Sequence, residues 1–166
     1  MSADAAKDPT TSARLRFLAG VVMAEAKHLL LTDERLFSVP MTPERAMTLG
    51  SDIDLSERTD AFVARFGRLQ DTLADKLLPA LLDALAEPVG AAIDNLNRAE
   101  RLGWISSVSD WLEARRLRNR MIHEYVADAT ELASALTLAH DTVPVLDGAA
   151  RAMAARAHSD GLIRPG

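Results

Sequence analysis

The stretch AFVARFGRLQDTLADKLLPALL, residues 61–82, decides the fold class of this chain. Its large apolar residues recur at steps of four, three, four and four: Phe62, Phe66, Leu69, Leu73 and Leu77. This spacing places them on one face of a helix, because an α-helix turns by about 100° per residue. Pro79 lies inside the same run and predicts a bend, since proline removes one backbone hydrogen bond of the helix.

The same periodicity extends to both sides of this stretch. Leu15, Leu18, Val22 and Leu29 predict a first long helix over 13–37. Downstream, Pro88 is expected to open a third helix, with its apolar residues facing inward: Val89, Ile93 and Leu96.

Two capping boxes predict where the last two helices begin. Ser107 and Asp110 have the required spacing for the fourth helix, and Asp128 and Glu131 for the fifth. The loop over 38–56, between the first two long helices, is long, and Thr42-Pro43 within it indicates a short helix.

These signals predict an all-α fold in one domain, a helical bundle of four to five helices. The expected bundle covers 13–156, between flexible tails over 1–12 and 157–166. Aromatic residues make up only 4% of the chain, so its core must be built from Leu, Ala, Val and Met.

Composition also limits the function. The chain has 166 residues and no cysteine, which excludes disulfides, thiolate metal sites and a cysteine nucleophile. No secretory signal and no apolar run of the roughly 18–20 residues that span a bilayer are present. We therefore expect a soluble, cytoplasmic protein without a membrane contact. Its net charge of −5 disfavours a protein that coats nucleic acid nonspecifically.

The segment RLRNRMIHEY, residues 116–125, departs from this acidic background. Guanidinium groups bind phosphate, so Arg118 is a candidate ligand, and Arg115, Arg116 and Arg120 are candidate RNA-phosphate contacts. The imidazole of His123 can take a proton from a ribose 2′-hydroxyl or donate one to a leaving oxygen, with Asn119 to orient it. Together these groups suffice for RNA cleavage without a metal or another cofactor.

Helix geometry separates the two main groups. Arg118 and His123 are five residues apart, about 140° around a straight helix, so one intact helix does not pair them. A two-fold dimer with this segment at its interface would supply both groups to one cleft. Tyr125, seven residues after Arg118, shares its stripe. The alternative is an ordinary helix end, whose arginines suit solvent and the helix dipole.

The segment LRNRMIHEY, residues 117–125, resembles the R-x4-H-x-Y signature of HEPN-domain proteins, in particular the HepT-like toxins. The match falls on Arg118, His123 and Tyr125, with Asn119 directly after the arginine. The segments RLQDTLADKLLPALL and ERLGWISSVSDWLEARRLRNRMIHEY are also similar to HepT-like sequence, in the same order. The similarity is clearest over 57–130.

The resemblance implies an HEPN-like bundle that forms a homodimer with its motif helices facing each other. It implies a metal-independent endoribonuclease with Arg118 and His123 as the catalytic pair. HepT-like toxins belong to type VII-like toxin–antitoxin systems and are partnered by a minimal nucleotidyltransferase (MNT) antitoxin. That partner transfers AMP from ATP to the motif tyrosine, here Tyr125, and silences the enzyme. The expected substrate is RNA, such as tRNA or mRNA.

Two other functions stay open at this stage. The chain could be a catalytically inactive HEPN accessory subunit that binds a nucleotidyltransferase and its nucleotide or substrate. It could also be a helical interaction module in which the motif is a coincidence. The long loop over 38–56 is a candidate partner contact under any of these readings, or an element that shapes the RNA cleft.

Overall fold

The computed structural model describes residues 9–124 and 128–159. The α-helices in these ranges are α1 (Pro9–Leu36), α2 (Pro43–Met47), α3 (Ile53–Asp71), α4 (Leu78–Ala84), α5 (Ala92–Arg101), α6 (Val108–Glu124) and α7 (Ala129–His158). A 3-10 turn (Thr48–Gly50) lies between α2 and α3, and a π turn (Thr72–Leu77) joins α3 to α4. No strand occurs in the described ranges, which confirms the predicted all-α class.

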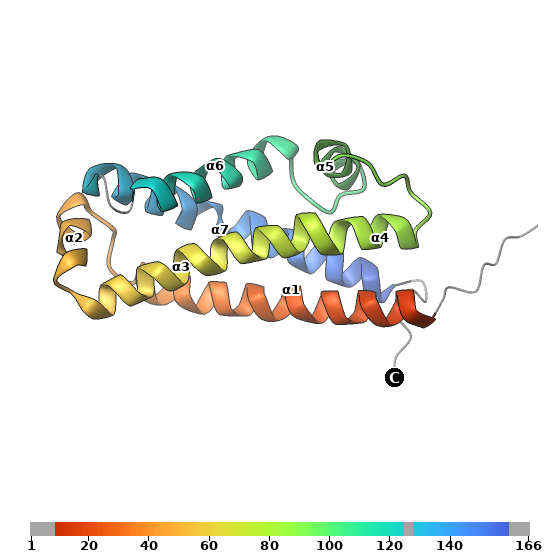
Figure 1. Cartoon of the computed structure of the whole chain (residues 1–166), viewed down its shortest axis with the longest axis horizontal. Coiled ribbons are helices and arrows are strands. Elements are labelled where there is room, and N and C mark those ends of the chain that lie inside the picture. Colours follow the sequence, from red (N-terminus) through yellow and green to blue (C-terminus); the bar gives the residue numbers. More distant parts are fainter. Residues whose placement is uncertain (1–8, 125–127, 160–166) are drawn as a thin grey trace, which may run out of the picture.

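The long helices form a bundle in which α3 and α4 run on as one continuous rod (Figure 1). Helix α1 packs against α3 and α7, and α6 packs against the same two helices. Helices α1 and α6 do not contact each other and therefore occupy diagonal corners. The short α2 closes one end of the bundle against α7, and α5 lies at the other end against α4 and α6 (Figure 1).

The core between these helices is built from leucine and alanine around a few aromatic rings. Trp111, Phe62 and Phe66 are completely buried. Helix α7 buries mainly alanines, which lack bulk and let neighbouring helices approach closely. The core thus consists mainly of the aliphatic residues that the low aromatic content predicted.

Pro79 follows a widened turn of the helix. The N–H of Leu78 bonds to the carbonyl of Leu73, five residues back, at the end of the π turn. A proline ring crowds the carbonyl four residues before it. The wider turn before Pro79 gives that ring space, so the helix continues through the proline into α4.

Predicted caps start several helices. The side chain of Asp128 accepts hydrogen bonds from the N–H groups of Thr130 and Glu131, and α7 follows. Thr42 accepts from Arg45 N–H at the start of α2, the short helix expected within the 38–56 loop. Helix α1 begins at Pro9, four residues earlier than predicted, because proline suits the first helical position.

The prediction for the third helix was wrong at its start. Helix α5 begins at Ala92, not at Pro88, and Val89 and Ile93 are 48% and 46% exposed. Only Leu96 of the predicted inward face is buried. The loop is instead held by the side chain of Asn95, which accepts from Gly90 N–H at 2.9 Å and donates to Gly90 O at 3.2 Å.

Candidate active site

Helix α6 presents its polar residues on the faces that the core does not cover. The helix follows Ser107, whose hydroxyl accepts a hydrogen bond from Asp110 N–H at 2.9 Å. Trp111, Leu117 and Met121 recur on one face and are buried against α3 and α7. This anchoring fixes the rotation of the helix. Arg115, Arg118 and Arg120 are half-buried at the edges of the packed face, whereas Arg116 and His123 are exposed on the open side.

Arg118 points across the seam to α3. Its Nη1 donates to Asp71 Oδ1 at 2.5 Å in an ion pair whose side chains are 32% and 45% exposed. The guanidinium crosses α3 over Gly67, where a β-carbon would lie 2.7 Å from Nε of Arg118. Gly67 therefore gives Arg118 the space to reach Asp71.

Further contacts continue this seam. Nη2 of Arg115 lies 3.9 Å from Oδ1 of Asp75, which belongs to the π turn. The buried side chain of Gln70 donates to the carbonyl of Ala114 at 3.0 Å. The two arginines of α6 thus meet the two aspartates in antiparallel order, and the seam has a fixed register.

His123 and Asn119 lie on the open side of α6. Both side chains are exposed and form neither a hydrogen bond nor an ion pair with any residue in the described ranges. Ile122 beside them is 52% exposed. The face that presents the imidazole is therefore available for a ligand or a second copy.

The described chain does not bring Arg118 and His123 together. Arg118 is turned toward α3 by its ion pair with Asp71, whereas His123 lies in the last turn of α6 on an open surface. This separation agrees with the angle of about 140° expected for residues five apart. Tyr125 lies outside the described residues.

The remaining arginines of the motif segment are occupied by carboxylates. Arg116 pairs with Glu113 at 2.8 Å, and Arg120 pairs with Glu131 of α7 at 2.8 Å. The positive charge of this segment is thus locally compensated. Because exposed ion pairs contribute only about 0–1 kcal/mol, a phosphate could displace these carboxylates, but they weaken the predicted basic patch.

Sequence reasoning missed Gly67 and Asp71. One signal in the sequence pointed to them: Gly67 lies inside a strongly periodic helix, four residues before the acidic Asp71. That signal cannot name the partner, because Arg118 lies 47 positions away in the chain.

A second ionisable pair joins α1 to α7. Nδ1 of His140 lies 2.7 Å from Oδ1 of Asp33, and the ring of Phe37 stacks on the imidazole with centroids 4.3 Å apart. Burial raises the pKa of the Asp33 carboxyl, although the hydrogen bond with His140 lowers it. His140 is thus a helix-to-helix link, not an isolated surface residue.

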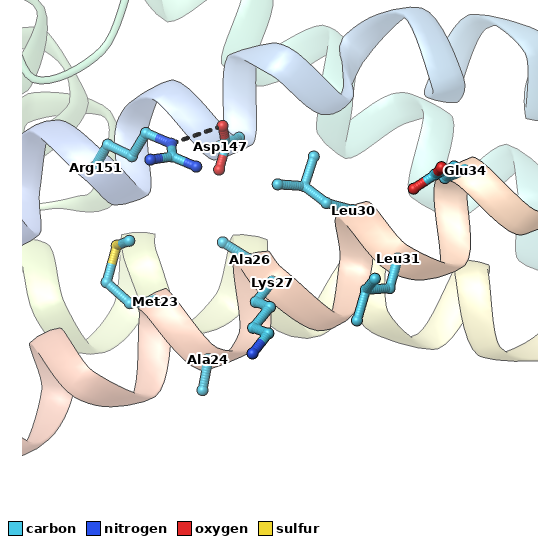
Figure 2. Close-up of a pocket in the computed structure, with 9 residues that line it drawn as sticks. All are labelled: Met23, Ala24, Ala26, Lys27, Leu30, Leu31, Glu34, Asp147 and Arg151. Atoms are coloured by element: carbon cyan, nitrogen blue, oxygen red, sulfur yellow. Dashed lines mark hydrogen bonds and ion pairs between the residues drawn. The ribbon is translucent and has the colours of Figure 1, made fainter.

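A groove of about 600 Å³ runs between α1 and α7 (Figure 2). Met23 and Leu30 contribute apolar surface, and Arg151 pairs with Asp147 at 2.9 Å along the α7 edge. Because α1 does not contact α6, this groove is separate from the motif helix. One carboxylate oxygen of Asp147 already binds Arg151. We assign this groove no role in the chemistry of α6.

The described residues contain no group of three or more His, Asp or Glu side chains that could hold a metal ion. Within the same ranges, no helix combines the length and the apolar character needed to cross a bilayer. In comparisons with known proteins, no family profile, no curated protein and no solved structure matches this chain.

Proposed function

We propose that this chain is a metal-independent endoribonuclease of the HepT-like type, with an HEPN-like bundle and a site completed by a second copy. One observation carries the proposal. Helix α6 presents Arg118 and an exposed His123 that has no partner among the described residues; these are two groups that suit RNA cleavage, and the described chain leaves them apart. A two-fold axis beside α6 would place the arginine of one copy near the histidine of the other.

In this mechanism, Arg118 binds the scissile phosphate. Its guanidinium has five N–H donors, and the bond from Nη1 to Asp71 leaves the others for phosphate oxygens. Asp71 is then a positioning residue, because it holds the guanidinium at a fixed place on α3 instead of touching the substrate.

His123 performs the proton transfers. As a neutral imidazole it removes the proton from the ribose 2′-hydroxyl, and the new 2′-oxygen–phosphorus bond forms while the bond to the 5′-oxygen breaks. The imidazolium formed in this step then returns its proton, through a water molecule, to the leaving 5′-oxygen, so one His123 serves each site. The products are a 2′,3′-cyclic phosphate and a free 5′-hydroxyl. Asn119 lies four residues before His123 on the same stripe and makes no hydrogen bond with the ring in the single chain, so its orienting role belongs to the assembled site with substrate bound.

The proposed partner is an MNT-type nucleotidyltransferase antitoxin, so the chain would be the toxin of a type VII-like toxin–antitoxin system. Transfer of AMP to Tyr125 would add a bulky anion seven residues after Arg118 and exclude a substrate phosphate by charge and size. Such a system acts in the cytoplasm, where RNA and ATP are available.

The proposal is tested with wild type and His123→Ala. Purified wild type should cleave tRNA or mRNA in the presence of a chelator, and His123→Ala should lose cleavage and growth arrest while keeping the dimer and its helix content. Wild-type cleavage by His123→Ala would overturn the mechanism. After co-expression with the nucleotidyltransferase, wild type should gain the mass of adenylate, and Tyr125→Phe should not.

A second candidate function is an accessory subunit without catalysis. Exposed apolar side chains in the 38–56 segment favour it, since Val39, Met47 and Ile53 are 55%, 68% and 74% exposed. Apolar residues of this kind suit a protein partner. A wild-type protein that leaves every tested RNA intact but forms a stable complex with the nucleotidyltransferase would favour this function over the first.

A further inference from the structure

A groove between α1 and α3 is lined by four arginines. Two adjoining hollows of about 220 and 380 Å³ share Arg65 as a common wall. Helix α3 contacts both α1 and α6 and lies between them, so it separates this groove from α6 (Figure 1). We refer to it as the arginine groove, formed by Arg35, Arg58, Arg65 and Arg68.

The charges in this groove are largely unpaired. Within the described ranges, the guanidinium groups of Arg35, Arg58 and Arg68 form no hydrogen bond or ion pair. Each of the four arginines of α6, in contrast, binds a carboxylate. Asp54 and Glu57 also line the groove, but neither reaches an arginine within ion-pair distance. Unlike α6, the α1–α3 side therefore offers guanidinium groups that no carboxylate of the described residues occupies.

Arg65 fixes the middle of the groove. Its Nη1 donates to the carbonyl of His28 at 3.3 Å and to the hydroxyl of Thr32, so it joins α3 to α1. Arg58 and Arg68 flank it along α3. The ten residues from Arg58 to Arg68 rise by about 15 Å. At about 3.4 Å for each nucleotide of a stacked strand, this length matches about four nucleotides.

The groove ends beside the Arg118 site. Arg68 directly follows Gly67, on which the Arg118 guanidinium lies, and projects about 100° further around α3. A strand bound in the groove can therefore continue over α3 toward Arg118.

Among the described residues that line this end of the groove, Glu25 is the carboxyl, and it opposes phosphate only weakly. Asp71, whose charge also acts on Glu25, lies beyond the groove and is bound by Arg118. Burial raises the pKa of Glu25, although a hydrogen bond from the Thr72 hydroxyl and the charge of Arg68 lower it. That hydroxyl donates to Oε1 at 3.1 Å, and Oε2 is buried without a hydrogen-bond partner among the described residues. The carboxyl is thus easier to neutralise than one in water.

We propose that the arginine groove binds the phosphates of single-stranded RNA that flank the scissile bond at Arg118, an inference that rests on the proposed ribonuclease function. Among the described residues no Phe, Tyr or Trp lines the groove, so the contact senses backbone charge and not base identity. An acidic protein is the alternative polyanionic ligand for these arginines. Protein interfaces need apolar anchors, and among the described residues that line the groove Ala61 is the only aliphatic one.

The test measures binding of a short fluorescein-labelled single-stranded RNA of mixed sequence across a potassium chloride series, with His123→Ala as the background to prevent cleavage. Adding Arg58→Ala and Arg68→Ala should weaken binding and reduce the slope of log K against log salt by about 0.7 for each lost phosphate contact. The matched control, Arg14→Ala with Arg101→Ala, removes the same charge from exposed positions outside the groove. Its slope of log K against log salt should fall less than that of the Arg58/Arg68 variant. Glu25→Gln should tighten binding.

The outcomes separate this inference from the proposed function. If wild type neither binds nor cleaves RNA, both are wrong. RNA binding could depend on Arg118 while the Arg58/Arg68 variant has the same RNA affinity and salt slope as the Arg14/Arg101 control. In that case the groove inference is overturned and the ribonuclease proposal stands. Unchanged RNA binding with a lost nucleotidyltransferase complex would make the groove a protein interface and also overturn the inference.

Discussion

The guanidinium of Arg118 rests on the backbone of Gly67, so closely that a β-carbon at position 67 would lie 2.7 Å from its Nε. This relationship decides where the arginine can point. With Gly67 beneath it, Arg118 reaches Asp71 and is held on α3 instead of extending into solvent. A residue without a side chain on one helix thus positions the candidate phosphate ligand of another.

Replacing Gly67 with alanine should separate activity from stability. Alanine raises helix stability by up to about 1 kcal/mol relative to glycine, and the displaced exposed ion pair is worth about 0–1 kcal/mol. We therefore expect the free energy of unfolding in urea to stay within about 1 kcal/mol of wild type. RNA cleavage should fall by about 100-fold, because Arg118 is pushed from its place.

Gly20→Ala in α1 is the matched control. Apart from its chain neighbours and the backbone of its own helix turn, no atom of the described residues lies within 4 Å of a β-carbon at position 20, so this variant should gain stability and cleave RNA like wild type. Wild-type cleavage by Gly67→Ala would show that the position of Arg118 on α3 has no part in the reaction.

Asp71→Asn should act on kcat more than on KM. The amide keeps the shape of the side chain but loses the charge that holds Arg118, and we expect kcat to fall on the order of tenfold, about 1.4 kcal/mol in the barrier. The change in unfolding free energy should be below about 1 kcal/mol, since both side chains are partly exposed. Asp75→Asn, whose carboxylate lies 3.9 Å from Arg115, serves as the control and should keep the wild-type kcat. An Asp71→Asn protein with unchanged kcat would remove Asp71 from the mechanism.

Glu25→Gln should change the pH dependence of stability. Because burial raises the pKa of this carboxyl in the folded chain, the folded state holds its proton to higher pH than the unfolded state. Stability contributed by Glu25 is therefore full below its ordinary pKa of 4.5 and is lost as pH rises through the raised value. The glutamine variant lacks this loss and should equal or exceed wild type in urea denaturation at pH 7. If the unfolding free energy of wild type rose relative to that of Glu25→Gln as pH increases, the sign of the pKa shift would be contradicted.

The helices could be predicted because their signals are local. The apolar spacing of Phe62 and Phe66 marks a buried face wherever the rest of the chain lies. Ser107 and Asp128 likewise cap helices through partners two or three residues away. The third helix was misplaced because Pro88 and Val89 imitate a helix start, whereas the Asn95 side chain folds the preceding residues into a loop.

The surroundings of the site could not be predicted because they depend on which helices meet. Local charge alone suggested that Arg116 and Arg120 were free for phosphate, although the (i, i+3) partner Glu113 was visible beside Arg116. Glu131, the partner of Arg120, lies on the next helix, and its approach follows from the packing of α6 on α7. Arg58 and Arg65 of α3 line one hollow together with Arg35 of α1. Because this group draws on two helices, the residue spacing within a single helix does not predict it.

The most direct measurement mixes two inactive chains, Arg118→Ala and His123→Ala, in co-expressed dimers and follows RNA cleavage in a chelator. If one site takes its arginine and its histidine from different copies, mixed dimers contain one intact pair, and cleavage should return although each variant alone is inactive. Mixing Arg118→Ala with the Arg118→Ala/His123→Ala double variant supplies no arginine and should stay inactive. Mixed dimers that form but do not cleave RNA, beside a wild type that does, would contradict the composite site.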